Sequence, residues 1–312
     1  MTSLAPLPAG RPQRIVYFGT PEMAVPPLEA VVAAGFDVAL VVTRVDKRRG
    51  RGSDTAPSPV KAAAQRLLIP VSHRVADALD VGADLGVVVA FGQLIREPIL
   101  EQLPMVNLHF SLLPRWRGAA PVERALLAGD VTTGVCLMQL DVGLDTGPIL
   151  DVVEVPIGAS QTADELRHVL VEIGSEQLVR NLAAGIGPAT PQVGEVTYAA
   201  KLDPTEFEID WSKPAVVIDR FVRLGVAWTT FRGKRLKVIS ASPVAGDEVV
   251  ANFAGADPGV YTGSLRIGAG QGAIELHVVQ PEGKPKMDAK SWANGIQPRL
   301  GEHVGTTNAE AQ

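Results

Sequence analysis

Residues 83–91 of this chain, ADLGVVVAF, form an almost uninterrupted apolar run with the length of a single strand. Runs of this kind are typical of strands that are covered on both faces, as in parallel sheets flanked by helices. The run therefore predicts a sheet with helices on both sides, and the neighbouring sequence should alternate between strands and helices.

The neighbouring sequence has this alternation. Further strands are predicted at 14–18, 37–43, 69–71, 105–110, 134–140 and 148–155. Helices are predicted between them at 22–34, 57–68, 120–128 and 162–184. Thr162 and Glu165 have the spacing of a capping box at the start of the last helix. From residue 14 to about 140, this order predicts an α/β fold with a parallel, doubly wound sheet.

The pattern changes after residue 184. Residues 185–195 are rich in Gly and Pro, a helix is predicted at 214–224, and short strands follow at 236–239, 259–262, 264–267 and 273–279. Short strands separated by turn residues are typical of a small β-barrel or sandwich. We expect a catalytic domain at 12–190, a linker at 191–209, a second domain at 210–305, and flexible tails at 1–11 and 306–312.

Composition excludes several classes of protein. The longest apolar runs are far shorter than the roughly 20 residues of a membrane helix, and the first residues lack the pattern of a secretory signal. Cys136 is the single cysteine of the 312 residues, so the chain cannot form an internal disulfide. We expect a cytoplasmic protein without a membrane partner. The net charge of −5 argues against non-specific nucleic-acid binding, although residues 210–312 are mildly basic and permit local contact with a polyanion.

Candidate chemistry lies at the predicted strand ends. Asn107 and His109 are two residues apart on one strand and therefore point to the same side. Asp145 follows a later strand and lies between Gly143 and Gly147, which favours a sharply turned loop. Taken alone, His109 is better explained as a hydrogen-bonded core histidine, and Asp145 is equally explained as a turn residue. Together they have the composition of an acid–base pair beside an amide donor.

The order of these residues resembles the formyltransferases that use 10-formyltetrahydrofolate. Those enzymes have an Asn and a His two apart, an SLLP loop directly afterwards, and an Asp about 35 residues later. Here the loop is Ser111–Pro114, and Asp145 lies 36 residues beyond His109. The strongest matching runs are VVVAFGQLI (87–95), NLHFSLLPRWRGAAPVERALLAGD (107–130) and TGVCLMQLDVGLDTG (133–147).

Within that superfamily the chain is most similar to the branch that acts on methionyl-tRNA. The resemblance extends over FGTPEMAVPPLEA (18–30), APSPVKAAA (56–64), TYAAKLDPTEFEIDWS (197–212) and QPEGKPKMDAKSWANG (280–295). The last two of these runs indicate the branch. The resemblance implies a Rossmann-like formyltransferase domain followed by an OB-like barrel that binds tRNA. It also implies transfer of the formyl group of 10-formyltetrahydrofolate to the α-amino group of methionyl initiator tRNA, for translation initiation. We further expect a monomer that needs no metal.

The resemblance assigns roles to particular residues. Asn107 would donate to the oxyanion that forms during transfer, and Asp145 would fix the tautomer of the imidazole. His109 would carry the proton, or it would stay protonated and help to hold the oxyanion. The folate would contact Val88, Val89, Ala90, Phe91, Gly92, Leu94, Ile95, Ser111, Leu112, Leu113, Pro114, Asp141 and Gly143. Relatives often have Tyr at the position of Phe91, so a contact through that hydroxyl would be lost.

The tRNA would contact a basic loop and basic positions nearer the C-terminus. These are Lys47, Arg48, Arg49, Arg51, Lys201, Arg232, Lys234, Arg235, Lys284 and Lys286. The residues beyond Gly52 depart from the lysine-rich pattern of the family, and a charge run of this kind is also explained as a solvated loop.

Other functions share some of these features. A sugar-nucleotide N-formyltransferase would use the same donor, but it should lack the Arg-rich loop and the QPEGKPKM segment. A glycinamide ribonucleotide formyltransferase would end near residue 200, and a formyltetrahydrofolate hydrolase would use water as the acceptor. A non-catalytic RNA-binding protein would not need the combination of Asn107, His109 and Asp145.

Overall fold

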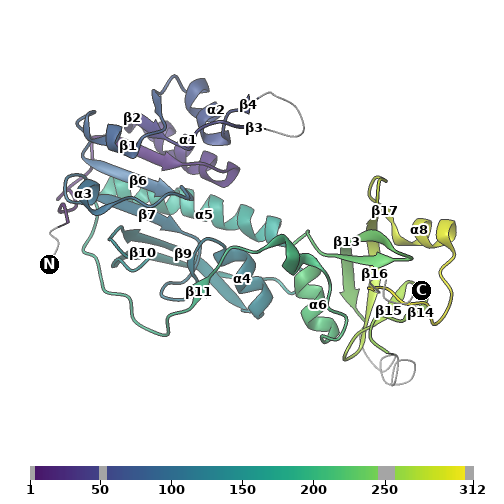
Figure 1. Ribbon diagram of the computed structural model, residues 1–312. Coiled ribbons are helices and arrows are strands. Elements are labelled where there is room, and N and C mark those ends of the chain that lie inside the picture. The colour runs from purple at the N-terminus through teal and green to yellow at the C-terminus, as the bar shows by residue number, and fades with distance from the viewer. Residues whose placement is uncertain (1–3, 49–54, 245–256, 306–312) are drawn as a thin grey trace. The chain divides into compact units, whose positions relative to one another are not determined.

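A computed structural model describes residues 4–48, 55–244 and 257–305 of the chain (Figure 1). The predicted tail 306–312, together with Arg49 and Arg51 of the basic loop, lies outside the described residues. The chain divides into two compact units. The first comprises Met1–Arg124, Val131–Ile157 and Leu166–Lys201, and the second comprises Ala125–Asp130, Gly158–Glu165 and Leu202–Gln312.

The first unit is built on a seven-stranded sheet with the order β10-β9-β7-β6-β1-β2-β5. The strands are β1 (Arg14–Gly19), β2 (Asp37–Val42), β5 (Val71–Ser72), β6 (Leu85–Val89), β7 (Met105–His109), β9 (Thr132–Gln139) and β10 (Ile149–Pro156). The first five are parallel to one another, which confirms the doubly wound part of the prediction. All five residues of β6 and of β7 are buried, as expected for strands covered on both faces.

The strand predicted at 134–140 differs from the prediction in its direction. β9 pairs antiparallel with β7, and β10 pairs antiparallel with β9, so the sheet is mixed. Strand direction depends on the edge at which the chain re-enters the sheet, and the buried run of β9 has the same pattern for either direction. The last residue of β9 pairs with Val106, near the start of β7. The loop after β9 must therefore fold back along β7 to reach His109 at its end.

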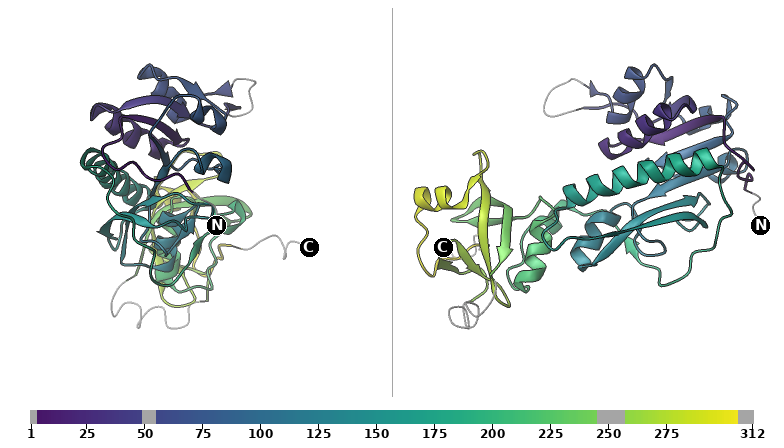
Figure 2. Two further views of the ribbon diagram at one scale, coloured as in Figure 1. Left: turned by 90° about the vertical axis from the view of Figure 1, so that its left-hand side faces the viewer. Right: turned by 180° about the vertical axis from the view of Figure 1, so that it is seen from behind.

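Four helices lie close to the predicted positions. They are α1 (Val25–Ala33), preceded by a 3-10 turn at Glu22–Ala24, then α2 (Pro59–Arg66), α4 (Pro121–Ala128) and α5 (Ala163–Ala184). The short helix α3 (Glu97–Leu100) was not predicted. A second 3-10 segment covers Val75–Leu79. Helix α5 runs beside the sheet (Figure 2). It approaches the sheet closely at Gly174, where an added Cβ would lie 3.1 Å from the side chain of Leu108 and 3.2 Å from Val135.

The second unit is an antiparallel sheet with the order β12-β13-β16-β15-β14, and β17 pairs with β16. Its strands are β12 (Trp228–Phe231), β13 (Lys234–Pro243), β14 (Tyr261–Gly263), β15 (Arg266–Gly268), β16 (Ala273–Pro281) and β17 (Met287–Asp288). Val304 bridges to Phe231 and His303 bridges to Val260. These two adjacent residues therefore connect the two edges of the sheet. This arrangement agrees with the predicted small barrel.

An apolar cluster fills the described part of the second unit. Helices α6 (Ala215–Val222) and α8 (Ala289–Ile296) contribute Ile218 and Trp292, which pack with Trp211, Phe231 and Leu276. Strand β12 and helix α8 were not predicted, because β12 has only four residues and Gly295 lies within α8. No helix in the described part of the chain is both long and apolar enough to cross a membrane.

The remaining elements are short. Strands β3 (Lys47–Arg48) and β4 (Thr55–Ala56) pair antiparallel, and β3 is the first part of the basic loop. In the first unit, β8 (Arg117–Gly118) pairs in parallel with β11 (Tyr198–Ala199). This pairing brings part of the predicted linker against the loop that follows His109. A 3-10 turn at Pro204–Phe207 follows in the second unit.

Candidate functional site

A cavity of about 520 Å³ lies in the first unit, beside the carboxyl ends of β6 and β7. The loops after β6 and β9 and the beginning of α4 complete its wall. Residues of the wall that the sequence predicted as functional are Val88, Ala90, Phe91, Gly92, Leu94, Ile95, Asn107, His109, Asp141, Gly143 and Asp145. The fold thus brings together three segments that are widely separated in the sequence.

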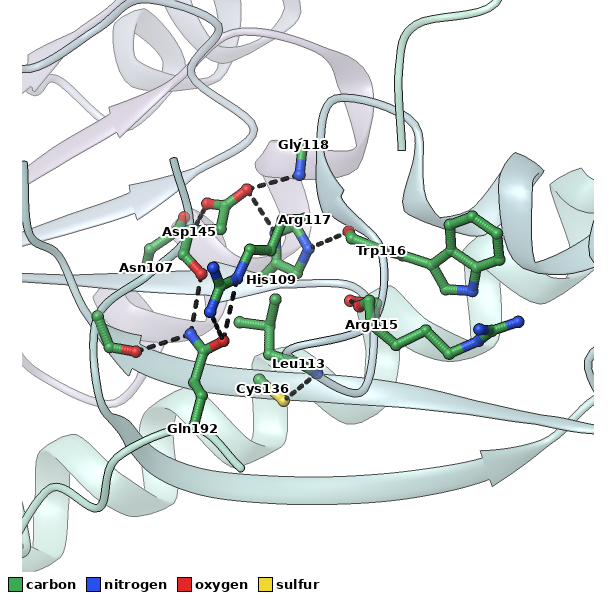
Figure 3. A network of polar contacts seen from close by, with 12 residues as sticks. Asn107, His109, Leu113, Arg115, Trp116, Arg117, Gly118, Cys136, Asp145 and Gln192 are labelled. Atoms are coloured by element: carbon green, nitrogen blue, oxygen red, sulfur yellow. Dashed lines mark hydrogen bonds and ion pairs between the residues drawn. The ribbon is translucent and has the colours of Figure 1, made fainter. Parts of the chain in front are cut away.

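Asn107 and His109 both line the cavity from β7, with exposed fractions of 8% and 6%. Their common orientation follows from the two-residue repeat of a strand. The amide nitrogen of Asn107 lies 3.4 Å from Oδ1 of Asp145, and Nδ1 of His109 lies 3.7 Å from Oδ2 of the same carboxylate (Figure 3). The three predicted catalytic side chains therefore meet at one point of the cavity wall.

The backbone of Asp145 is held in the left-handed region, with φ of 51°. Few residues other than glycine adopt this conformation, and it recurs at functional sites. The conformation directs the carboxylate back toward β7, and the N–H of Gly118 donates to Oδ2 at 2.8 Å. A Cβ at Gly147 would clash with the carbonyl oxygen of Gln139, so the end of this loop requires a glycine.

The tautomer of His109 is set by a different group from the one predicted. Its Nε2 lies 2.9 Å from the carbonyl oxygen of Trp116 (Figure 3). A carbonyl can only accept, so Nε2 carries the hydrogen in the neutral ring, and Nδ1 carries the lone pair. The distance of 3.7 Å from Nδ1 to Asp145 is too long for a hydrogen bond. The carbonyl of Trp116, rather than Asp145, therefore fixes the tautomer.

Several residues predicted to contact folate lie away from the cavity wall. Val89 is fully buried on the opposite side of β6, between two residues that do line the cavity. The hydroxyl of Ser111 donates to the carbonyl of Arg115 at 2.7 Å, and Leu113 packs against Cys136 and Met138. The residues outside the wall are Val89, Ser111, Leu112, Leu113 and Pro114. In the loop Ser111–Pro114, Leu113 therefore points into the core and not into the cavity.

Three polar residues at or beside the site were not found from the sequence. Glu123 and Arg167 both line the cavity and form an ion pair of 2.7 Å between α4 and α5. Gln192 contacts the loop of Asp145 from within the predicted linker. None belongs to a local motif, since their partners lie more than 40 residues away in the sequence.

Lys47, Arg48 and Lys201 of the predicted tRNA contacts belong to the first unit. The backbones of Lys47 and Arg48 form β3, and Lys201 is exposed where that unit ends.

Lys234, Arg235, Lys284 and Lys286 are exposed in the second unit. The N–H of Arg235 donates to the carboxylate of Glu282, and the N–H of Glu282 donates to the carbonyl of Arg235. These bonds bring the β12–β13 hairpin and the turn before β17 together. Arg232 forms an ion pair with Glu302, with Nη2 to Oε2 at 2.9 Å, which raises the pKa of Arg232 through that hydrogen bond.

Within the part of the chain that the structure describes, no three His, Cys, Asp or Glu side chains form a cluster suited to a metal ion. Cys136 is buried beneath the site, and burial raises the pKa of its thiol to about 11.

Models of known protein families match most of the chain. The family model described as formyl transferase matches residues 13–182, and the model for the formyl transferase C-terminal domain matches residues 201–297. An N-formyltransferase from Helicobacter canadensis, solved with folinic acid and dTDP-3-aminofucose, has a similar fold, with a TM-score of 0.64. It is 19% identical and the match covers 85% of this chain and 98% of that one, which shows a common fold and no more.

Relatives of higher identity define the branch. A methionyl-tRNA formyltransferase of Symbiobacterium thermophilum is 43% identical over 305 residues, covering 90% of this chain and 92% of the relative. One from Jannaschia sp. is 42% identical, covering 91% and 97%. The chain belongs to the methionyl-tRNA formyltransferase family and is an enzyme of formyl transfer.

Proposed function

We propose that the chain transfers the formyl group of 10-formyltetrahydrofolate to the α-amino group of methionyl initiator tRNA. The observation that carries this proposal is the meeting of Asn107, His109 and Asp145 on the wall of one cavity, in a chain that matches methionyl-tRNA formyltransferases over most of its length. An enzyme that acts on methionyl-tRNA works where translation takes place, so we also propose a cytoplasmic location, and we propose that it acts as a monomer.

The cavity suits a folate donor. Its volume of about 520 Å³ falls within the usual range of ligand sites, roughly 300–1,000 Å³. The segment from Ala90 to Ile95 offers apolar side chains beside backbone groups, a combination that fits a flat heterocycle with hydrogen-bonding edges. Asp141 and Gly143 lie on the facing loop. The bound donor would supply the formyl group that is transferred.

The three polar residues supply what acyl transfer to an amine requires. The reaction develops negative charge on the formyl oxygen, and the amide N–H of Asn107 is a neutral donor that can stabilise it. Nδ1 of His109 can accept a proton from the attacking amine and return it to the leaving nitrogen. Asp145 lies 3.7 Å from this nitrogen, and its negative charge stabilises the ring while the ring carries the proton.

The acceptor would be held through its phosphates. Lys201, Lys234, Arg235, Lys284 and Lys286 are exposed, and exposed cations bind phosphates with little preference for base sequence. Lys47 and Arg48 begin the loop that we propose contacts the acceptor stem, together with Arg49 and Arg51. Among these residues Arg232 should contribute least to phosphate binding, because Glu302 already neutralises its charge.

The experiment is formyl transfer from 10-formyltetrahydrofolate to three acceptors in parallel: methionyl initiator tRNA, methionyl elongator tRNA and an amino-sugar nucleotide. We expect strong preference for the initiator. Equal transfer to both tRNAs would reject the proposed discrimination, and transfer to the sugar alone would reject the tRNA acceptor while retaining the roles of Asn107 and His109.

A further inference from the structure

Gln192 connects two loops of the catalytic site through every hydrogen-bonding position of its side chain (Figure 3). Its Nε2 donates to the carbonyl oxygens of Asp145 and Gly147, each at 2.8 Å. Its Oε1 accepts from Nη2 of Arg117 at 2.7 Å and from Nε at 3.2 Å. A glutamine amide has two N–H donors and two acceptor lone pairs, and all four are used here.

At the donor end, Gln192 holds the backbone of the loop that bears the catalytic carboxylate. The two carbonyls belong to Asp145 and Gly147, on either side of Thr146, so the amide spans the turn. Asp145 has the positive φ of 51°, which is costly for a residue with a side chain unless its surroundings enforce it. The bonds from Gln192 oppose relaxation of this backbone, which would turn the carboxylate away from His109.

At the acceptor end, Gln192 holds Arg117, which stands between two residues that contact the catalytic groups. The carbonyl of Trp116 accepts from His109, and the N–H of Gly118 donates to Asp145. A closed ring of contacts therefore runs from the Asp145 carboxylate through Gly118 and Arg117 to Gln192, and back to the Asp145 backbone. Displacement of either loop would strain the other.

We propose that Gln192 is a positioning residue for formyl transfer, which sets the alignment of Asp145 with His109 without touching the reacting atoms. This inference rests on the proposed catalytic roles of Asp145 and His109. It assigns a function to a residue of the predicted linker.

The test is Gln192→Glu, which preserves size and the bonds from Arg117 but removes both donors. A carboxylate would then face two carbonyl oxygens and push the Asp145 loop away. A misplacement on the order of 1 Å can cost about a hundredfold in rate, so we expect kcat to fall about tenfold to a hundredfold. The KM values for donor and tRNA should stay within about twofold, because the displaced groups act mainly in the transition state.

Val193→Ala is the matched control, since Val193 is the next residue and its side chain is 88% exposed. It should have the kcat of the unmodified enzyme. Arg117→Met removes only the acceptor-side bonds and should lower kcat less than Gln192→Glu does. The double variant should lower kcat no more than Gln192→Glu alone, because both changes act on one ring of contacts. If the losses in kcat of the two single variants add in the double variant, the proposal is overturned.

A second measurement separates positioning from general stabilisation and needs no transfer assay. The ring ¹⁵N resonances of His109, assigned with a His109→Gln variant, should move in Gln192→Glu and stay unchanged in Val193→Ala. A lower melting temperature with unchanged kcat and unchanged ring resonances would show a merely structural role and refute positioning. If the unmodified chain transfers no formyl group yet the resonances move as expected, the proposed function fails while the alignment by Gln192 stands.

Discussion

Asn107 is the single neutral side-chain amide among the three proposed catalytic residues, and it is almost fully buried at the cavity wall. Its amide can donate to a developing oxyanion without a change of charge. Removal of one such donor typically lowers the rate about 100- to 1,000-fold. We expect a loss in kcat of this size for Asn107→Ala, measured by steady-state formyl transfer.

Asn181→Ala is a suitable control for that experiment, because it removes the same amide from α5, where Asn181 donates to Asp151. Its kcat should be unchanged. If Asn107→Ala retained near-normal turnover, the role as oxyanion donor would be untenable.

Cys136 gives a prediction that depends on pH. Burial is the main reason that the pKa of its thiol rises to about 11, and the N–H of Leu113 opposes this only partly. When the pH is above the ordinary thiol pKa of about 8.5, the thiol keeps its proton in the folded chain and loses it in the unfolded chain. Stability from this group is therefore complete at neutral pH and declines as the pH rises from about 8.5 to 11.

Alkylation by iodoacetamide tests this environment directly. At pH 8 the native thiol should react far more slowly than the same thiol in urea, because it is buried and protonated. Mass spectrometry of the modified peptide measures both rates. Equal rates would contradict the burial of Cys136.

At the scale of the element, α5 begins with a reciprocal pair of hydrogen bonds. The N–H of Thr162 donates to the carboxylate of Glu165 at 2.9 Å, and the N–H of Glu165 donates to the Thr162 hydroxyl at 3.3 Å. This capping box was predicted from the sequence, because both partners are local. Thr162→Ala should lower the free energy of unfolding by about 1 kcal/mol.

Urea denaturation followed by circular dichroism measures that change. Thr162→Ser keeps the hydroxyl and should restore most of the lost stability. Equal losses in the free energy of unfolding for Thr162→Ala and Thr162→Ser would show that the hydroxyl does not cap the helix.

At the scale of the whole molecule, the charge is unevenly divided along an acidic chain. The overall charge is −5, yet the second unit exposes Lys234, Arg235, Lys284 and Lys286. If these groups bind tRNA phosphates, the affinity should fall steeply with salt, because bound counterions are released. Lys234→Ala should weaken binding and reduce the slope of log K against log salt by about one.

Arg232→Ala is the informative comparison, because Arg232 occupies the same hairpin but is paired with Glu302. We expect little change in the salt slope for this variant. Filter binding over a range of salt concentrations measures both. An unchanged slope for Lys234→Ala would remove this hairpin from the tRNA footprint.

Features that depend on residues close together in the chain could be predicted from the amino-acid sequence. The apolar run 83–91 predicted a strand covered on both faces, and the two-residue spacing of Asn107 and His109 predicted their common orientation. The turn at Asp145 was predicted from its neighbouring glycines. These are local consequences of strand geometry and backbone conformation, so no knowledge of the fold is needed.

The groups that complete the site could not be predicted, because they come from segments that meet only in the folded chain. The direction of β9, the hydrogen bond from His109 to Trp116, and the ion pair of Glu123 with Arg167 each depend on where separate segments meet. Gln192 reaches Asp145 across 47 residues from a stretch with the composition of a linker. Its role follows from packing, because a side chain's partners are set by the space around it and not by its neighbours in sequence.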